Sequence, residues 1–239
     1  MFETHMDLFV RGRYQASCSQ ILSQILECTK FPWDSKISRI PIQTFDLLSD
    51  FIENSEGAVF QPCYVSLFES CLLQLRLSTE ELMSWDELDH DKKMDRKDYQ
   101  NCVINCCDQL GPEECLRLVF AALNGSSDPA ILESCLSCLS FIARYLPSIE
   151  TVYLPTVVSN LAALPDIPAV NAARTELVGR LSGWISENPA YIEPLLIQLV
   201  GTLPHPNLSL TAANSIMQIC KLCSRSGRVP LLAMNEQIQ

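Results

Sequence analysis

Glycine is scarce in this chain. Only eight of its 239 residues are Gly, although 48% of the residues are hydrophobic. All-β sandwiches and barrels need Gly and Asn at frequent tight turns, so this composition argues against both and favours helices.

Two kinds of apolar segment are missing as well. The N-terminal residues MFETHMDLFVRGRY have no apolar stretch of the signal-peptide type, and no run approaches the roughly 18–20 apolar residues that a membrane span needs. We therefore expect a soluble intracellular protein without a membrane partner. Its twelve cysteines are expected to be reduced and to behave mostly as small apolar side chains.

Positive charge is in short supply. Seventeen Lys and Arg face 28 Asp and Glu, which gives a formal net charge of −11. Such a chain repels phosphates and attracts basic partners over roughly a Debye length, ~8 Å in physiological salt. We therefore expect no direct binding of nucleic acid, and the charge favours basic protein partners.

Catalytic and metal-binding patterns are also sparse. The three histidines lie far apart in the sequence, at His5, His90 and His205. Two Cys-x-x-Cys pairs, Cys135/Cys138 and Cys220/Cys223, contain the four thiolates of a zinc site, but each pair falls within an amphipathic helical pattern that favours core packing. A catalytic cysteine with distant partners stays open, because triad residues need not be close in sequence. We predict no enzyme, no metal and no cofactor.

Internal repeats are the most informative pattern that is present. Three segments align without gaps: DPAILESCLSCLSFIARYL from Asp128, IPAVNAARTELVGRLSGWI from Ile167 and HPNLSLTAANSIMQICKLC from His205. Their prolines, Pro129, Pro168 and Pro206, fall 39 and 38 residues apart. Equivalent positions are apolar together at helical spacing, and proline suits the first turn of a helix. Each segment is therefore predicted to be one amphipathic helix.

A second, shorter helix type alternates with the first. YLPTVVSNLAALP begins at Tyr153 and YIEPLLIQLVGTLP begins at Tyr191, 38 residues later. A helix pair that recurs every ~40 residues is typical of a HEAT-repeat solenoid, whose pairs bury their apolar faces against one another. We predict an all-α HEAT-repeat α-solenoid, a right-handed superhelical array of antiparallel helix pairs.

The array is expected to extend over 1–239 as a single segment of about five pairs. Looser pairs are predicted at residues 15–54 and 62–111, a further helix at 113–125, and a new helix start at Val229. Neither end has the polar face of a capping repeat, so we expect a fragment or short isoform of a longer array.

One highly charged insertion interrupts the array at residues 79–98, TEELMSWDELDHDKKMDRKD. It contains eight acidic and four basic side chains and is predicted to be a solvated loop or a frayed helix between two helices. Its carboxylates either meet a basic partner or are merely solvated. Trp85 is either an exposed anchor for a partner or folds back, with Leu82 and Met83, onto the adjacent helices. The candidate partner-binding residues are Glu80, Glu81, Trp85, Asp86, Glu87, Asp89 and Asp91.

The stretch ELVGRLSGWISENP, residues 176–189, is predicted to be a scaffold helix of one repeat. Asn188-Pro189 should end it, because the residue before proline avoids the helical region. Gly179 and Gly183 each cost ~1 kcal/mol of helix propensity relative to Ala, so we expect a neighbouring helix to approach closely there.

The order of motifs in residues 175–223 resembles the transportin-SR/importin-13 branch of the karyopherin-β nuclear transport receptors. These motifs are Glu-Leu-Val-Gly at 176–179, Asn188-Pro189, an aromatic-x-x-Pro start at 191–194, and Ile219 with Cys220 and Cys223. The likeness is strong from about 112 to 224 and weak before residue 40; it rests on order and spacing more than on any single motif.

The resemblance implies a receptor that carries protein cargo, with basic or serine/arginine-rich segments, between nucleus and cytoplasm. In the full-length family such receptors respond to the Ran GTPase, and nucleoporins are further candidate partners. The family's N-terminal Ran-binding repeats and its arginine-rich cargo helix match no part of this chain, so no Ran or cargo residue is assigned. The alternative is a HEAT-repeat scaffold that holds a protein complex without transport activity.

Overall fold

The computed structural model describes residues 61–88 and 90–225, with five scattered positions between 17 and 27. The helix pair predicted at 15–54 and the helix start at Val229 lie outside these ranges or almost wholly so. Within the described ranges the chain forms α-helices and 3-10 turns and no strand, which confirms the all-α prediction. It divides into two compact units, one formed by the chain up to Arg76 with Asp89–Leu118, the other by Leu77–Leu88 with Val119 onwards.

In the part of the chain that the structure describes, the first unit contains two long helices and the start of a third. These are α5 (Gln61–Gln74), α7 (His90–Leu110) and the first half of α8 (Pro112–Asn124). Helices α5 and α7 pack on each other, and Phe68 and Val103 are fully buried. Helix α7 stops at Gly111, whose φ of 84° is the left-handed conformation that glycine adopts without strain at a helix end.

The second unit contains the remaining elements. With 3-10 turns written η, they are α6 (Thr79–Met83), η2 (Trp85–Glu87), the end of α8, α9 (Pro129–Ile142), η3 (Ala143–Tyr145), α10 (Leu154–Asn160), η4 (Leu161–Ala163), α11 (Pro168–Arg180), α12 (Ser182–Glu187), η5 (Pro189–Tyr191), α13 (Ile192–Thr202) and α14 (Ser209–Arg225).

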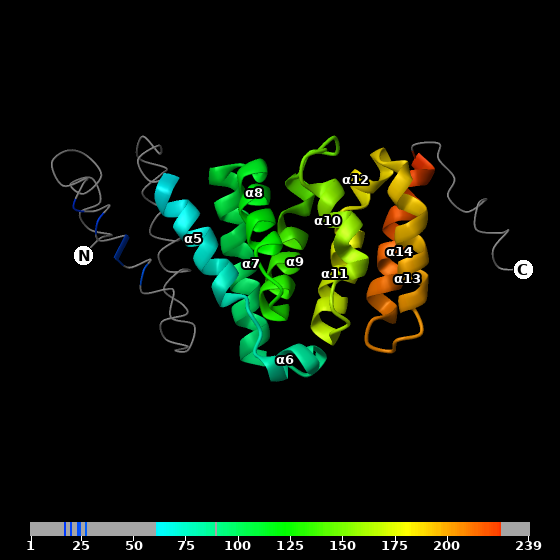
Figure 1. The fold of residues 1–239 in the computed structure, drawn as a ribbon, viewed down its shortest axis with the longest axis horizontal. Coiled ribbons are helices and arrows are strands. Elements are labelled where there is room, and N and C mark those ends of the chain that lie inside the picture. Colours follow the sequence, from blue (N-terminus) through cyan, green and yellow to red (C-terminus); the bar gives the residue numbers. More distant parts are fainter. Residues whose placement is uncertain are drawn as a thin grey trace, which may run out of the picture. The chain divides into compact units, whose positions relative to one another are not determined.

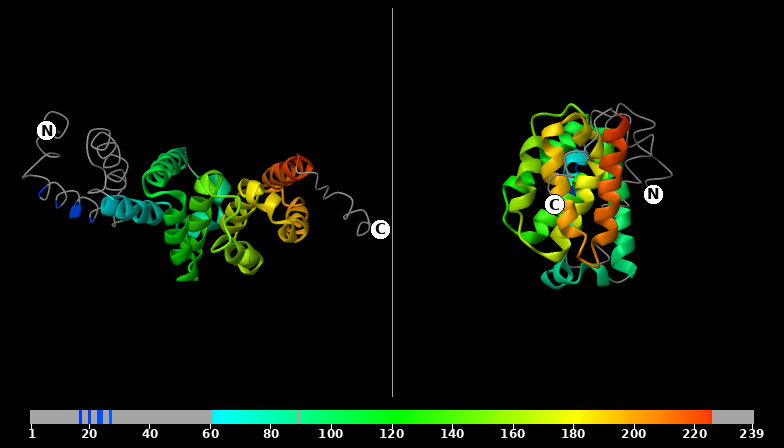
Figure 2. Two further views of the ribbon diagram at one scale, coloured as in Figure 1. Left: turned by 90° about the horizontal axis from the view of Figure 1, so that it is seen from above. Right: turned by 90° about the vertical axis from the view of Figure 1, so that its right-hand side faces the viewer.

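The three aligned segments become the helices α9, α11 and α14 of this unit. Helix α11 packs on both of the others (Figure 1), as stacked repeats require. Pro129 and Pro168 occupy the first turn of α9 and α11, as predicted. In the third repeat the helix begins only at Ser209, three residues after Pro206. The shorter segments become α10 and α13, and α13 lies beside α14 (Figure 2).

The stretch 176–189 is not one continuous helix. Helix α11 ends at Arg180, Leu181 leaves helical geometry with φ −81° and ψ 6°, and α12 follows. A Cβ on Gly179 would lie 2.4 Å from Ser215 Oγ of α14, which confirms the close approach predicted there. The same prediction is wrong for Gly183, since nothing lies within 4 Å of its virtual Cβ. Asn188 ends α12 with φ −120° and ψ 72°, as expected before Pro189.

Candidate partner-binding edge

The first half of the charged insertion is a docked element rather than a loop. Residues 77–88, which we call the strap, bury Leu77 and Leu82 together with Ala169 of α11. Helix α6 of the strap contacts α9 and α11 (Figure 1). The partly buried side chains that pack against this cluster are Trp85, Leu88, Ala130 and Ile167. Apolar burial therefore holds the strap at the N-terminal ends of α9 and α11.

A capping box explains why a helix forms in so acidic a stretch. Ser78 Oγ accepts a hydrogen bond from the Glu81 amide at 3.2 Å, and the Ser78 amide donates to Glu81 Oε2 at 2.7 Å. Reciprocal bonds of this kind satisfy two amides that the first helical turn leaves unpaired. The Glu81 carboxylate thus has a local structural role, whereas Glu80, in the same turn, is exposed.

A long-range hydrogen bond joins the strap to the third repeat of the unit. Asn207 Nδ2, in the turn between α13 and α14, donates to Asp86 Oδ2 at 2.6 Å across 121 residues of sequence. Nothing in the local sequence of either residue predicts this contact. The strap therefore touches all three aligned repeats, through Ala130, Ala169 and Asn207.

The structure brings together five of the seven predicted site residues. Glu80, Asp86 and Glu87 are exposed on the strap, and Glu81 and Trp85 are half-buried there. Because Leu82 belongs to the buried cluster and Trp85 packs against it, the structure favours the interpretation in which both fold back. Met83, which was expected to fold back with them, is instead exposed.

The other two predicted residues do not join this group. Asp91 is exposed in the first turn of α7, in the other unit, and Asp89 lies outside the described residues. Helix α7 begins at His90, so the second end of the insertion, predicted as a solvated loop or a frayed helix, is helical.

Two carboxylates that sequence reasoning missed lie beside the strap. Asp128 and Asp166 are exposed just before α9 and α11, next to the strap-contacting residues Ala130 and Ile167. Asp128 Oδ1 accepts a hydrogen bond from the Ala130 amide at 3.0 Å as an N-cap, which is the usual role of Asp before a helix. The sequence signal that could have identified them is an acidic residue one place before Pro129 and two places before Pro168.

Arg174 is the cation nearest to this group on its own helix. It donates to the Leu161 carbonyl at 3.1 Å and to Asn171 Oδ1 at 2.7 Å, while Asn171 Nδ2 donates to Asp166 Oδ1 at 2.6 Å. Burial lowers the pKa of Arg174, and the charge of Asp166 counteracts this. Asp166 is therefore partly offset by Arg174. We call the exposed carboxylates of Glu80, Asp86, Glu87, Asp128 and Asp166 the acidic edge.

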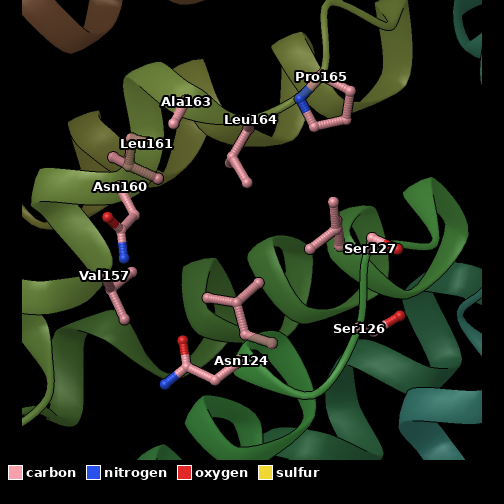
Figure 3. Close-up of a pocket in the computed structure, with 11 residues that line it drawn as sticks. Asn124, Ser126, Ser127, Val157, Asn160, Leu161, Ala163, Leu164 and Pro165 are labelled. Carbon is pink, nitrogen blue, oxygen red and sulfur yellow. The ribbon is translucent and has the colours of Figure 1, made fainter.

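A groove opens next to the acidic edge. Its volume is about 480 Å³, and it lies between α8, the start of α9, α10 and η4 (Figure 3). Asn124 and Asn160 lie toward one end of it, whereas Ser127 and Pro165 lie toward the other. The residues that line the groove are Leu123, Asn124, Ser126, Ser127, Leu132, Val157, Asn160, Leu161, Ala163, Leu164 and Pro165.

The cysteine pairs lie inside the helix stack. Cys135 and Cys138 are fully buried in α9, Cys223 is buried in α14, and Cys220 is half-buried there. Among the residues that the structure describes, no three His, Cys, Asp or Glu side chains come close enough together to hold a metal ion. A search of the same residues for a helix long and apolar enough to cross a membrane also finds none.

Known proteins resemble this chain in sequence over most of its length. Residues 151–229 match the family described as "Transportin-3/Importin-13 third TPR domain". Importin-13 of Bos taurus is 22% identical over 223 residues, which cover 85% of this chain and 23% of that protein. The mRNA transport regulator MTR10 of Saccharomyces cerevisiae is 21% identical over 178 residues, which cover 70% of this chain and 18% of that protein. The chain thus spans less than a quarter of the length of these relatives.

The fold has a counterpart among solved structures. A structure described as "Importin13 cytosolic state" superposes with a TM-score of 0.78 at 20% sequence identity, covering 94% of this chain and 29% of that one. This match confirms the predicted HEAT-repeat solenoid fold.

Proposed function

Because the chain belongs to the transportin/importin-13 branch of the karyopherin-β family, we propose that it binds protein cargo for transport between nucleus and cytoplasm, with the acidic edge as the contact surface. The acidic edge of the second unit is the observation that carries this proposal. Its five carboxylates are exposed and come from three places in the sequence, so their gathering is a property of the fold. The proposed role is binding, with no catalytic step.

Charge selects the class of cargo. In the second unit, Lys and Arg occur in the described residues only at Arg144, Arg174, Arg180, Lys221 and Arg225, and of these only Arg174 is linked by hydrogen bonds to the acidic edge. Such a surface attracts Lys- or Arg-rich segments, raises their association rate and discriminates against acidic proteins. Basic or serine/arginine-rich cargo fits this charge.

The strap gives the surface a fixed shape. Its buried Leu77 and Leu82, its capping box and its bond to Asn207 hold Glu80, Asp86 and Glu87 on an ordered backbone. Ordered charges bind with a smaller entropic cost than charges on a flexible loop. Asp91, on the other unit, is proposed as a separate and weaker contact.

The residue-level test is a titration of the full chain with a serine/arginine-rich cargo domain. The triple variant Glu80→Gln, Asp86→Asn, Glu87→Gln keeps the side-chain shapes and the acceptor for Asn207. With ~0.2–1 kcal/mol for each exposed charge, it should weaken binding about tenfold. A control variant, Glu187→Gln with Glu193→Gln, removes two exposed charges of the same unit outside the acidic edge and should change little. Equal effects of the two variants would remove the acidic edge from the proposal.

The response to Ran distinguishes a transport receptor from the alternative, a HEAT-repeat scaffold. Transport receptors of this family are expected to release import cargo when Ran is loaded with GTP, and the same behaviour is proposed for the longer receptor to which this segment corresponds. A pull-down with Ran in its GTP and GDP states, with and without basic cargo, measures this in a receptor that carries both this segment and the Ran-binding repeats. Binding of one fixed complex in both nucleotide states would favour the scaffold.

A further inference from the structure

We propose that the groove lined by Leu132, Val157 and Leu161 binds an extended basic peptide segment and buries one apolar side chain of that segment. This inference rests on the proposed receptor function and names a second subsite, next to the acidic edge, for the same class of partner. It assigns a binding role to a part of the molecule in which sequence reasoning identified no site.

The floor of the groove is apolar. Leu132, Val157 and Leu161 come from α9, α10 and η4 and have only 5%, 2% and 1% of their surface exposed. Leu123 and Leu164 are half-buried at its sides. A volume of about 480 Å³ falls within the roughly 300–1,000 Å³ of typical binding pockets, and it exceeds the volume of one Leu side chain. The groove can therefore bury one apolar side chain with adjoining backbone.

The rim is polar in a way that suits a peptide backbone. The amides of Asn124 and Asn160 are exposed at one end of the groove (Figure 3). Each side-chain amide both donates and accepts hydrogen bonds, as each peptide unit of an extended chain does. Ser126 and Ser127 line the groove from the α8–α9 connection, where Ser126 Oγ accepts a hydrogen bond from the Asp128 amide at 3.0 Å. An extended segment could thus form hydrogen bonds at the rim while its apolar side chain points to the floor.

Charge complementarity fixes the flanking residues of the segment as basic. Asp128 follows the lining residue Ser127, and Asp166 follows the lining residue Pro165. Ala130 lies two residues after Asp128, and Ile167 lies one residue after Asp166. Both pack against the buried cluster of the strap, so the carboxylates of the strap extend the negative charge. Because Arg174 offsets Asp166, Asp128 should contribute more to binding than Asp166.

The wall of the groove is held in place from behind. Arg174 donates to the Leu161 carbonyl at 3.1 Å, and Asn171 links Arg174 to Asp166. These bonds connect η4 and the following turn to α11, the helix at the centre of the stack. The groove is therefore largely preformed, which limits the entropic cost of binding a peptide.

The test is fluorescence anisotropy with the full chain and three short synthetic peptides. The first peptide has a central Leu flanked by Lys and Arg, the second has Ala in place of Leu, and the third has Gln in place of the basic residues. Burial of one Leu side chain predicts that the Ala peptide binds about tenfold more weakly. Loss of the flanking charges should weaken binding by a similar factor at low ionic strength and by less at high ionic strength.

Two neighbouring alanines provide a matched pair of variants. Ala163 lines the groove and Ala162 does not, and both are exposed in η4. Ala163→Phe should fill the groove and weaken the Leu peptide about tenfold with little effect on the Ala peptide. Ala162→Phe should affect neither. Circular dichroism and thermal melting of both variants confirm that each still folds.

The charge assignment has its own variants. Asp128→Asn keeps an N-cap residue while it removes the charge, and should weaken the Leu peptide about two- to threefold. Asp166→Asn keeps an acceptor for Asn171 and should have a smaller effect. Glu193→Gln, in α13, is the control and should have none.

Several results would overturn the groove assignment. Equal binding of the Leu and Ala peptides would do so, as would tight binding of the uncharged peptide. Equal effects of Ala163→Phe and Ala162→Phe would also contradict it. Concentration-dependent self-association that Ala163→Phe abolishes would make a second copy of the chain the occupant. If basic cargo binds and loses affinity when the acidic edge is neutralised, but Ala163→Phe has no effect, only the groove fails. If no basic cargo or peptide binds at all, the proposed function fails with it.

Discussion

The two halves of the charged insertion are both rich in charged side chains, but their structures differ. Residues 79–88 contain Leu82, Met83, Trp85 and Leu88, and they dock on the second unit as the strap. Residues 90–98, HDKKMDRKD, have Met94 as their one large apolar side chain and form the first turns of α7 in the first unit. A few apolar side chains at suitable spacing decide where a charged segment goes, because burial of each stabilises more than an exposed charge costs.

The largest expected effect is the loss of the strap's buried leucine. Leu82 is 5% exposed, so Leu82→Ala should destabilise the docked strap by about 2–3 kcal/mol, the lower part of the range for buried leucines. Met94 is 42% exposed in the other half, and Met94→Ala should change stability by less than about 0.5 kcal/mol. Amide hydrogen exchange resolves the two halves separately, and equal protection changes in both variants would remove the distinction.

The next effect concerns a hydrogen bond that links the second half to the residue after α5. Arg96 Nη1 donates to the Leu75 carbonyl at 2.5 Å, just beyond the end of α5. A charged donor on a carbonyl at a helix C-terminus is favourable, so Arg96→Ala should destabilise the first turns of α7 by about 1.5 kcal/mol. Lys97→Ala, an exposed neighbour, is the control and should cost less than about 0.5 kcal/mol in the same exchange experiment.

A smaller effect should follow removal of the capping box. Ser78→Ala removes the Oγ that accepts the hydrogen bond from the Glu81 amide and weakens the reciprocal bond from the Ser78 amide to Glu81 Oε2. The expected loss of stability of α6 is about 1 kcal/mol. Thr79→Ala, the exposed next residue, should be nearly neutral. If Ser78→Ala left the exchange of the α6 amides unchanged, burial of Leu82 alone would account for this helix.

The smallest effect belongs to the contact with the third repeat. A double-mutant cycle of Asp86→Ala and Asn207→Ala should give a coupling free energy of about 0.5–1 kcal/mol, because both side chains are exposed. Chemical denaturation of the two single variants and the double variant measures it. A coupling of zero would mean that the strap touches only the first two repeats in solution.

The repeats were predictable from sequence because their signals are local. Pro129 and Pro168, followed by apolar residues at helical spacing, predict α9 and α11. Tyr153 and Tyr191 mark the starts of the segments that form the shorter helices α10 and α13. For the insertion, dense charge was interpreted as a solvated loop or a frayed helix, because the capping box at Ser78 that stabilises α6 was overlooked.

The candidate site was predictable only in part, for a physical reason. Glu80, Asp86 and Glu87 stand out in the sequence as charges, but Asp128 and Asp166 join them only through the packing of the strap on Ala130 and Ile167. The Asp86–Asn207 bond spans 121 residues and has no local signal. Gly179 and Gly183 look alike in sequence, and only the crossing of α11 and α14 at Ser215 distinguishes them.

The most direct test of the acidic edge as a cargo surface is the salt dependence of cargo binding. The full chain and a serine/arginine-rich cargo domain are titrated at several ionic strengths, with the triple variant Glu80→Gln, Asp86→Asn, Glu87→Gln beside it. We predict that affinity falls steadily as salt screens the exposed charges, and that the variant binds more weakly with a shallower dependence on salt. Binding with the same salt dependence in both proteins, or no binding in either, would contradict the account.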